Sequence, residues 1–356
     1  MPLVVGLNHE TAPLPLREKL ANLSAHLSET LWRLKEPFSL NGMVLLSTCH
    51  RIEIYACSTH RAETREALAR QLQAQAQVES LRSCLYYQEG EKAVRHLFRV
   101  ASGLDSMVKG ENEILNQVKQ AYLSAKQNGS TDKLLNVLFQ RSLYVGKRVR
   151  TETALSSGFS SIGSLAVTMA ECIFGSLRDR RILILGAGKM AEQTAKVLLS
   201  QNVKAILVSN RTFERAQELA AQFGGQAIPF EEGLRQMALV DVVICSTAAP
   251  HPVIGPELIK TVMQRRQGQP LSLIDIAVPR DVDPAVQAID NVHVYNIDDL
   301  QSIVDDSQSK RSREIQAAEI LVEEETREFA RWLQAHRSGC WHGLRHHPTP
   351  CPAAIA

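Results

Sequence analysis

Residues 43–56 read Met-Val-Leu-Leu-Ser-Thr-Cys-His-Arg-Ile-Glu-Ile-Tyr-Ala, and this stretch sets the fold expected for the first part of the chain. Its first four residues form a short apolar run, and its last six alternate polar and apolar side chains as a half-buried strand does. We therefore predict two strands joined by a tight connection that carries Cys49. The neighbouring His50 and Arg51 are cations able to lower the thiol pKa, which makes Cys49 a candidate nucleophile, although a lone cysteine is more often a small buried side chain.

The segments around this stretch predict an α+β domain over residues 1–155. Residues 3–7 read as an opening strand, and residues 84–88 as a later β-prone segment. The turn at Pro13 and Pro15, followed by stretches rich in helix-forming residues, predicts helices between these strands, near residues 16–23, 28–34 and 61–78. The resulting order, β-α-β-β-α-β with added helices, is that of a ferredoxin-like domain.

Residues 91–127 predict helical structure interrupted near Gly103 and Gly110. Apolar residues at helical spacing explain one face of it, but the segment also carries a dense set of polar side chains. Such side chains are by default solvated faces and caps, and their density here makes a functional role the alternative. The polar set comprises His96, Ser106, Glu111, Asn112, Glu113 and Gln117.

Residues 134–151 form a basic amphipathic stretch. A cluster of cations with an aromatic side chain suits contacts with the phosphates of an RNA, whereas the plainer interpretation is a solvated helix face. The cluster consists of Arg141, Tyr144, Lys147, Arg148 and Arg150.

Residues 181–191 predict a dinucleotide-binding domain over residues 156–296. A buried strand runs into Gly186-x-Gly188-x-x-Ala191, and a helix follows, which places the phosphates against the helix N-terminus. The candidate cofactor-binding residues of this loop are Gly186, Ala187, Gly188, Lys189, Met190 and Ala191.

The second strand of this domain ends in Asn210-Arg211-Thr212, where an NAD site would place an acidic residue for the ribose hydroxyl. Because no acid is present and Arg211 can pair with a 2′-phosphate, we predict NADPH as the cofactor and assign Asn210, Arg211 and Thr212 to its binding. The alternative is that Arg211 is only a surface turn residue.

The C-terminal part predicts one long helix over residues 297–336 and an irregular tail over residues 337–356. The tail is dense in His, Pro and Cys, and it reads as an out-of-frame or truncated end. Its histidines and cysteines have no rigid element to hold them at ligand spacing, so we expect no metal site.

The composition agrees with a soluble, cytoplasmic protein of two or three domains. The chain has 356 residues, 44% of them hydrophobic and 22% charged, and its seven cysteines show no Cys-x-x-Cys spacing. We expect neither a signal peptide nor a membrane span. Residues 1–150 carry 20 Lys and Arg against 14 Asp and Glu, which is compatible with a nucleic-acid partner there.

The Ser-Thr-Cys-His-Arg-Ile-Glu-Ile-Tyr segment resembles the Thr-Cys-Asn-Arg signature of the glutamyl-tRNA reductases, with His50 in the place of Asn. The Gly-Leu-Asn-His-Glu-Thr-Ala-Pro opening and Lys-Arg-Val-Arg-Thr-Glu-Thr also resemble family motifs. In that family the cysteine attacks the aminoacyl ester of glutamyl-tRNA(Glu), tRNA is released, and NADPH reduces the thioester to glutamate-1-semialdehyde, the first committed step of 5-aminolevulinate and porphyrin synthesis from glutamate.

The resemblance implies roles for individual residues of this chain. Cys49 would be the nucleophile and His96 the active-site histidine that polarises or protonates the carbonyl. Arg51 would bind a substrate carboxylate with its two-pronged guanidinium. The implied substrate-binding residues are Thr48, His50, Arg51, Ser106, Glu111, Asn112, Glu113 and Gln117.

The resemblance also implies partners and an assembly. The family is homodimeric through a helical domain after the long helix, and its product passes to glutamate-1-semialdehyde aminotransferase. Because this chain lacks the pattern of that domain, we expect the apolar stripe of the long helix to be exposed and the chain to be monomeric. Three alternatives remain open: a shikimate-dehydrogenase-like NADP oxidoreductase, a thioester-forming aldehyde dehydrogenase, and a non-catalytic product that binds tRNA or the aminotransferase.

Overall fold

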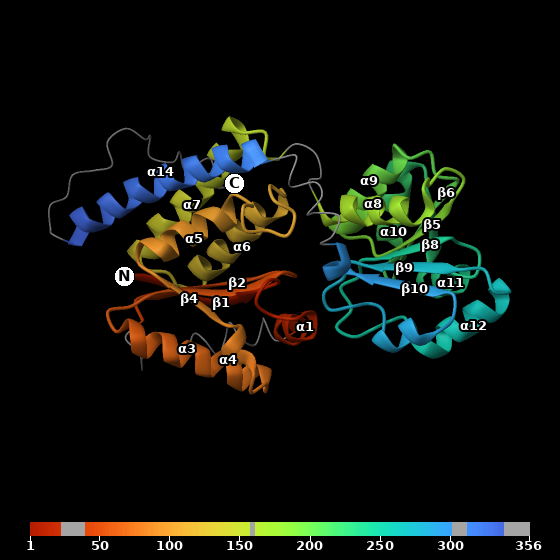
Figure 1. Cartoon of the computed structure of the whole chain (residues 1–356), viewed down its shortest axis with the longest axis horizontal. Coiled ribbons are helices and arrows are strands. Elements are labelled where there is room, and N and C mark those ends of the chain that lie inside the picture. The colour runs from red at the N-terminus through yellow and green to blue at the C-terminus, as the bar shows by residue number, and fades with distance from the viewer. Residues whose placement is uncertain (23–39, 157–160, 301–311, 338–356) are drawn as a thin grey trace.

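The computed structural model describes residues 1–22, 40–156, 161–300 and 312–337, which form two α/β units and a long C-terminal helix (Figure 1). The helix expected near residues 28–34 and the tail over residues 338–356 lie outside the described residues. Within the described part of the chain, no helix has both the length and the apolar character needed to cross a membrane.

The N-terminal unit is built on a four-stranded antiparallel sheet in the order β2-β3-β1-β4. Two helices, α1 and α3, separate the strands in sequence, so the chain has the expected ferredoxin-like β-α-β-β-α-β order, with α4 added before β4. The elements are β1 (Pro2–Asn8), α1 (Leu14–Asn22), β2 (Gly42–Ser47), β3 (Arg51–Cys57), α3 (Arg61–Ala76), α4 (Leu81–Cys84) and β4 (Tyr86–Glu89).

Helices cover both faces of this sheet. Leu3, Val5 and Leu7 pack on the side of α1 and α3, whereas Val4 and Tyr55 pack on the side of three later helices. Those helices are α5 (Glu91–Ala101), α6 (Glu113–Gln127) and α7 (Lys133–Glu152). Every residue of β3 is therefore buried, and the expectation of a half-buried strand is wrong because the polar face of β3 meets helices rather than water.

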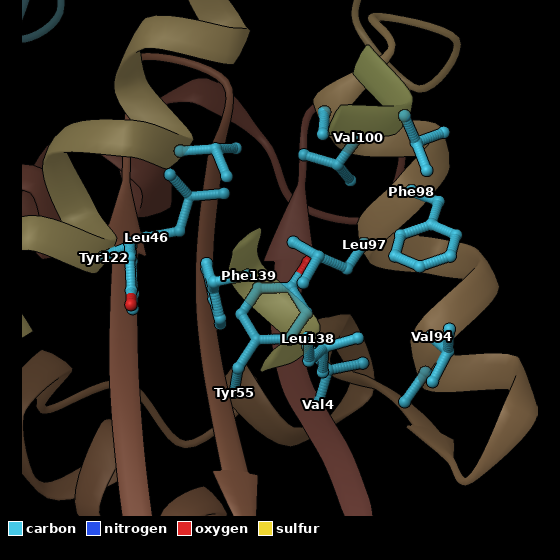
Figure 2. Packing of buried hydrophobic residues seen from close by; sticks show 14 of the residues in the cluster. Val4, Leu46, Tyr55, Val94, Leu97, Phe98, Val100, Tyr122, Leu138 and Phe139 are labelled. Atoms are coloured by element: carbon cyan, nitrogen blue, oxygen red, sulfur yellow. The ribbon is translucent and has the colours of Figure 1, made fainter. Parts of the chain in front are cut away.

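Figure 2 shows the second of these cores, where Tyr55 and Phe139 meet between the sheet and the helices. Their rings make an edge-to-face contact with centroids 5.5 Å apart, and Tyr122 stacks on Phe139 at 5.7 Å. Leu97 and Phe98 of α5 are fully buried beside them. Each such large apolar side chain contributes roughly 1.5–3 kcal/mol of stability on burial, which fixes the helices on this face of the sheet.

The second unit is a six-stranded parallel sheet in the order β10-β9-β8-β5-β6-β7, the doubly wound arrangement of dinucleotide-binding domains. The strands are β5 (Arg181–Leu185), β6 (Ala205–Asn210), β7 (Gln226–Pro229), β8 (Val242–Cys245), β9 (Leu271–Asp275) and β10 (Val292–Asn296). The expected Rossmann fold is confirmed, with β7 as an edge strand that the sequence analysis did not separate.

Helices flank this sheet on both faces, and their apolar sides fill two cores. Gly163 lies at the start of the first helix of this unit. It lets that helix pack closely on the helix that carries Thr194, because a Cβ on Gly163 would lie 2.7 Å from the Thr194 hydroxyl. The elements are α8 (Ile162–Phe174), α9 (Lys189–Leu199), α10 (Phe213–Phe223), α11 (Phe230–Gln236), α12 (Pro256–Arg266) and the 3-10 helices η1 (Pro284–Ala288) and η2 (Ile297–Leu300).

The C-terminal helix α14 (Ser312–Arg337) lies along α5 and α7 of the N-terminal unit (Figure 1). The expected helix thus does not begin at Ile297, where the chain forms the 3-10 helix η2 held by the Asn296 and Asp299 side chains. Val322 and Phe329 of α14 are buried, and Phe329 packs edge-to-face on Phe98 at 5.9 Å. The expectation of an exposed apolar stripe is wrong, because α5 and α7 cover it.

Ion pairs border this contact. Arg141 of α7 pairs with Glu325 at 2.5 Å and with Glu328 at 2.6 Å, and Arg148 pairs with Glu325 at 2.9 Å. Two α5 arginines, Arg95 and Arg99, pair in the same way with Glu323 and Glu319. The acidic side of α14 therefore faces a row of arginines from both helices.

Candidate active site

The Cys49 turn is held by hydrogen bonds within the β2–β3 hairpin. The Thr48 N–H donates to the Arg51 carbonyl at 2.9 Å, and the Thr48 hydroxyl accepts from the N–H groups of His50 at 3.2 Å and Arg51 at 3.1 Å. From α1, Arg17 Nη1 donates to the Cys49 carbonyl at 3.0 Å. Thr48 thus serves the turn itself, and Cys49 sits at its tip.

The Cys49 thiol is less acidic than the sequence suggests. Burial, and after it the Glu111 charge, raises its pKa to about 12, although Arg17 and Arg51 act in the opposite direction. His50 does not help, because burial lowers the pKa of this side chain well below its usual value and leaves the imidazole neutral. The expectation that adjacent cations lower the thiol pKa is therefore wrong in this arrangement: removal of water outweighs their charge.

His50 lies beside His9 in an edge-to-face contact, with ring centroids 5.6 Å apart. His50 is 5% exposed, and neither of its ring nitrogens has a hydrogen-bond partner among the described residues. The same holds for His9 Nδ1 and for the Ser106 hydroxyl. Since unpaired buried polar atoms are costly, this set marks the space near Cys49 as one that a polar ligand can satisfy.

Arg51 bonds to two carboxylates and one backbone carbonyl of the chain itself. Its Nη1 donates to Glu53 Oε1 at 2.8 Å and to Asp105 Oδ2 at 2.9 Å, and its Nη2 donates to the Asp105 carbonyl. The Arg51 side chain is 1% exposed. The expected grip on a substrate carboxylate is not what this structure shows, because the guanidinium fork is already used inside the fold.

Glu53 is the centre of this buried network. It accepts hydrogen bonds from the hydroxyls of Tyr55 and Tyr86, and its Oε1 lies 2.9 Å from His96 Nε2. Burial opposes ionisation of Glu53, but His96, Arg51 and the Tyr55 hydroxyl together lower its pKa below the usual range. His96 is thus oriented by a carboxylate, as a histidine that handles a proton should be.

The side chains of Glu53, His96 and Asp105 lie close enough to suggest a metal site, with ligand atoms within 4.8 Å of one another. The Arg51 guanidinium, however, bonds to both carboxylates and supplies the positive charge that a metal would bring. We therefore interpret this cluster as a network of ion pairs and hydrogen bonds, and the assignment of no metal stays a prediction.

Two glycines position the loop that carries Ser106 and Glu111. Gly103 and Gly110 have φ of 74° and 84°, and the Gly110 N–H donates to the Gly103 carbonyl at 2.9 Å. A Cβ on Gly110 would lie 2.1 Å from the Leu155 carbonyl oxygen, so no other residue fits. Glu111, held here, is buried, and burial raises its pKa to about 7.

The remaining predicted substrate residues follow along α6. Asn112 precedes the helix with an exposed side chain, and its carbonyl accepts from Arg150 Nη2 at 2.9 Å. Glu113 pairs with Lys189 of the dinucleotide loop at 3.2 Å. Gln117, one helical turn later, is half-buried. Of these residues, Glu113 thus contacts the second unit.

The basic cluster of α7 is mostly committed to the protein. Arg141 and Arg148 pair with glutamates of α14, and Arg150 donates to the carbonyls of Glu111 and Asn112. Of the two interpretations left open for this cluster, RNA contact and a solvated helix face, neither describes these three arginines, because acidic and carbonyl groups of the fold bind them.

The dinucleotide loop fits its predicted ligand. Gly186 has φ of 115°, and a Cβ there would lie 2.5 Å from the Ser246 carbonyl oxygen, so the tight turn requires glycine. A Cβ on Gly188 would meet nothing within 4 Å, which leaves room for a pyrophosphate beside the backbone. Gly188 precedes the 11-residue helix α9 without a side-chain cap. Ala191 is fully buried in the packing of α9 on the sheet.

The loop residues Ala187, Lys189 and Met190 lie at the junction of the two units. Ala187 and Met190 are partly buried against the apolar core of the second unit, while Lys189 reaches Glu113.

The Asn210–Thr212 turn at the end of β6 is open to a 2′-phosphate. Arg211 is exposed, forms no ion pair recorded among the described residues, and lies over the Phe230 ring at 5.9 Å. The Asn210 side chain donates to the Thr212 carbonyl at 2.9 Å and so holds the turn. Arg211 acts on the Asp281 carboxylate through its charge, but Arg211 forms no ion pair within residues 1–22, 40–156, 161–300 and 312–337.

Cys49 and the dinucleotide domain meet in one apolar cluster. Cys49 packs against a core that contains Leu14 and Met107 from the N-terminal unit and Ile276 from the end of β9. Ala187 of the glycine-rich loop and Val278 pack on the same core. The candidate nucleophile thus packs on a core to which the dinucleotide unit also contributes.

Sequence reasoning missed several residues of the site: Glu53, Tyr86, Asp105, His9 and Arg17. The sequence did contain a sign that Glu53 belongs to the site, because Arg51, Glu53 and Tyr55 are spaced by two and so share one face of a strand. Arg17 and Asp105 had none, since their partners are 32 and 54 residues away in the sequence.

Comparisons with known proteins agree with this geometry. The family described as glutamyl-tRNAGlu reductase, N-terminal domain, matches residues 5–153, and shikimate / quinate 5-dehydrogenase matches residues 168–303. The chain is 49% identical over 329 residues to the glutamyl-tRNA reductase of Desulforudis audaxviator, covering 92% of this chain and 73% of that one. It is 41% identical to the enzyme of Geotalea uraniireducens, covering 94% and 77%.

A solved structure supports the same assignment. The glutamyl-tRNA reductase from Methanopyrus kandleri is 40% identical, with a TM-score of 0.50 over 95% of this chain and 82% of that one. With the Cys49 turn, the buried Glu53–His96 pair and the dinucleotide fold on one chain, these likenesses show that the protein belongs to the glutamyl-tRNA reductase family.

Proposed function

We propose that this chain reduces glutamyl-tRNA(Glu) with NADPH to glutamate-1-semialdehyde and releases the tRNA, through a thioester on Cys49. The observation that carries the proposal is the contact of Cys49 with the apolar core shared by the loops of the dinucleotide domain. A thiol on that core can hold an acyl group where a nicotinamide domain can act on it. A shikimate-dehydrogenase-like enzyme would need no cysteine there.

The first half of the reaction is acyl transfer. The Cys49 sulfur attacks the ester carbonyl carbon, the bond from that carbon to the ribose oxygen breaks, and the tRNA oxygen takes a proton. Because burial keeps the proton on Cys49, a base has to accept it. Glu111 is the candidate acceptor, since its charge acts on the thiol and its pKa of about 7 lets it hold a proton.

The second half returns Cys49 to its thiol form. NADPH, when bound, supplies the two electrons and the hydrogen that convert the acyl carbon to an aldehyde. His96, fixed by Glu53 at 2.9 Å, is the candidate group to hold a proton near the developing oxygen anion. Gly186, Gly188 and the start of α9 would hold the cofactor's pyrophosphate, and Arg211 its 2′-phosphate.

The substrate side rests on polar groups near Cys49, among them the His50 ring nitrogens, which have no hydrogen-bond partner among the described residues. We propose that His50, Ser106 and Glu111 contact the glutamyl group, with Asn112, Glu113 and Gln117 further along the same side. His50 is a neutral imidazole here, so it can donate one hydrogen bond and accept one, as the amide of an asparagine does. The proposed partners are tRNA(Glu) and glutamate-1-semialdehyde aminotransferase, which would accept the aldehyde.

Labelled glutamyl-tRNA tests this function directly. Without NADPH, label should transfer to the peptide that contains Cys49; with NADPH, labelled aldehyde should appear and be trapped by an amine. Cys49→Ser should lose both, whereas Cys172→Ser, at an exposed cysteine of α8, should keep both. Label on protein in Cys49→Ser would overturn the assignment of the nucleophile, and ester binding without either product would favour the non-catalytic alternative.

A further inference from the structure

Two consecutive residues of α1 connect the Cys49 turn to the dinucleotide unit. Helix α1, which carries Arg17 and Glu18, lies on the side of the N-terminal unit that faces the second unit (Figure 1). The two residues carry opposite charges, and each pairs with an opposite charge across the boundary: Arg17 with Asp298, and Glu18 with Arg280. The two pairs therefore fix the register of one unit on the other.

Arg17 joins three parts of the chain with one guanidinium. Its Nε donates to the Ala12 carbonyl at 3.1 Å, its Nη1 to the Cys49 carbonyl at 3.0 Å, and its Nη2 to Asp298 Oδ1 at 2.5 Å. The Arg17 side chain is 1% exposed, while Asp298, on η2 directly after β10, is 42% exposed. The position of the Cys49 turn is thus tied, through one side chain, to the position of η2.

Glu18 binds Arg280 through both of its carboxylate oxygens. Arg280 Nε lies 2.8 Å from Oε1, Nη2 lies 2.8 Å from Oε2, and the Arg280 N–H donates to Oε1 at 2.7 Å. Arg280 follows Val278 in the loop after β9, which packs on the same core as Cys49. A two-pronged, partly buried pair of this kind sets orientation as well as distance.

We propose that Arg17 and Glu18 are positioning residues that hold the dinucleotide unit against the acylated Cys49 turn, so that reduction of the acyl group, but not its transfer from tRNA, depends on the pairs Arg17–Asp298 and Glu18–Arg280. This inference rests on the proposed function. Acyl transfer uses groups of the N-terminal unit alone, whereas reduction requires the second unit at a fixed place. Loss of the pairs should therefore uncouple the two half-reactions.

A charge exchange across the boundary tests the inference. Glu18→Arg and Arg280→Glu should each slow aldehyde formation by about tenfold or more in single turnover, with cleavage of glutamyl-tRNA in the absence of NADPH within about twofold of the original chain. NADPH binding, followed by fluorescence titration, should stay unchanged and shows that the dinucleotide unit is folded, while the retained ester cleavage shows that the N-terminal unit is folded. The double variant Glu18→Arg with Arg280→Glu should recover most of the lost rate. The matched control is Lys19→Glu, an exposed charge reversal on the same helix.

The outcomes separate this inference from the function on which it rests. If the original chain forms neither the Cys49 adduct nor aldehyde, the proposed function fails. If the original chain forms both the adduct and the aldehyde, and the single variants reduce the acyl group as fast as the original chain, the positioning role is overturned. A double variant as slow as the single ones would also overturn it, because specific pairing predicts recovery. Asp298→Asn supplies a milder second test, with a lower kcat for reduction and an unchanged KM for glutamyl-tRNA.

Discussion

Arg51 and Glu53 project from the same face of β3 and form a 2.8 Å ion pair in which both side chains are at most 1% exposed. The pair is extended by Asp105 on one side and by His96 and two tyrosine hydroxyls on the other. Paired and hydrogen-bonded in this way, the two charges can be buried, and they hold the histidine that the proposed reaction uses.

Replacing Glu53 tests how much this network stabilises the fold. Glu53→Gln keeps the shape but leaves the Arg51 charge without its buried partner, and we expect a loss of about 3 kcal/mol in the free energy of unfolding at pH 7. Tyr86→Phe, which removes one hydroxyl donor, should lose about 1 kcal/mol. Urea unfolding followed by circular dichroism measures both losses of stability.

The stability that Glu53 contributes should depend on pH. Because the pKa of Glu53 is lowered in the folded state, this contribution is present above its ordinary pKa of 4.5 and is lost as the pH falls below that value. The gap between Glu53→Gln and the original chain should therefore narrow in acid.

The two glycines of the dinucleotide loop should respond differently to alanine. Gly186→Ala places a Cβ on the Ser246 carbonyl at a positive φ and should lower the melting temperature. Gly188→Ala meets open space and should leave the melting temperature unchanged, yet weaken NADPH binding about tenfold, because the methyl group takes the room of the pyrophosphate. Equal NADPH affinity in Gly188→Ala and the original chain would contradict the placement of the pyrophosphate.

Arg211 should decide which nicotinamide cofactor binds. We expect NADPH to bind at least about tenfold better than NADH, a difference of about 1.4 kcal/mol, and Arg211→Asp to reverse or abolish this preference. The control is Arg215→Ala, an exposed arginine on the next helix, α10, which should keep it. Isothermal titration of the three proteins with both cofactors gives the six affinities, and equal affinities in the original chain would rule out the 2′-phosphate contact.

The substrate-free Cys49 thiol should react slowly with alkylating reagents near neutral pH. Its pKa of about 12 leaves little thiolate at pH 7, so iodoacetamide should modify the exposed Cys172 first. Glu111→Gln removes a charge that raises the Cys49 pKa and should speed the modification of Cys49. Peptide mass spectrometry follows this modification.

The rate of ester cleavage should instead rise with pH through about 7 in the original chain, as Glu111 loses its proton, and this rise should be absent in Glu111→Gln. A pH–rate profile measures it.

The packing of α14 predicts a contrast between two of its apolar residues. Phe329→Ala empties a fully buried site against Phe98 and should cost about 3 kcal/mol of stability or more. Ile320→Ala changes a side chain that is 54% exposed and should cost less than about 0.5 kcal/mol. Thermal unfolding compares the two, and similar losses would argue against the docking of α14 on α5 and α7.

The sequence predicted the fold more completely than the chemistry of the site. Hydrophobic period and turn residues are local, and they were enough to find the strand before Gly186, the helix after it and the hairpin around Cys49. The charge state of Cys49 is not local: it depends on burial and on Glu111, which is 62 positions away in the numbering. Arg51 was likewise assigned to the substrate because nothing in its neighbourhood along the chain reveals Asp105, its partner across the fold.

The course of the chain through its two units has a consequence for the N-terminal unit. The polypeptide leaves the N-terminal unit after α7, builds the dinucleotide fold and returns to the N-terminal unit with α14. The dinucleotide fold is therefore an insertion, tethered at both of its ends to the same body. Because the chain enters and leaves this unit from the same body, and α14 packs on α5 and α7, the N-terminal unit is completed only by residues that follow the dinucleotide fold in the sequence.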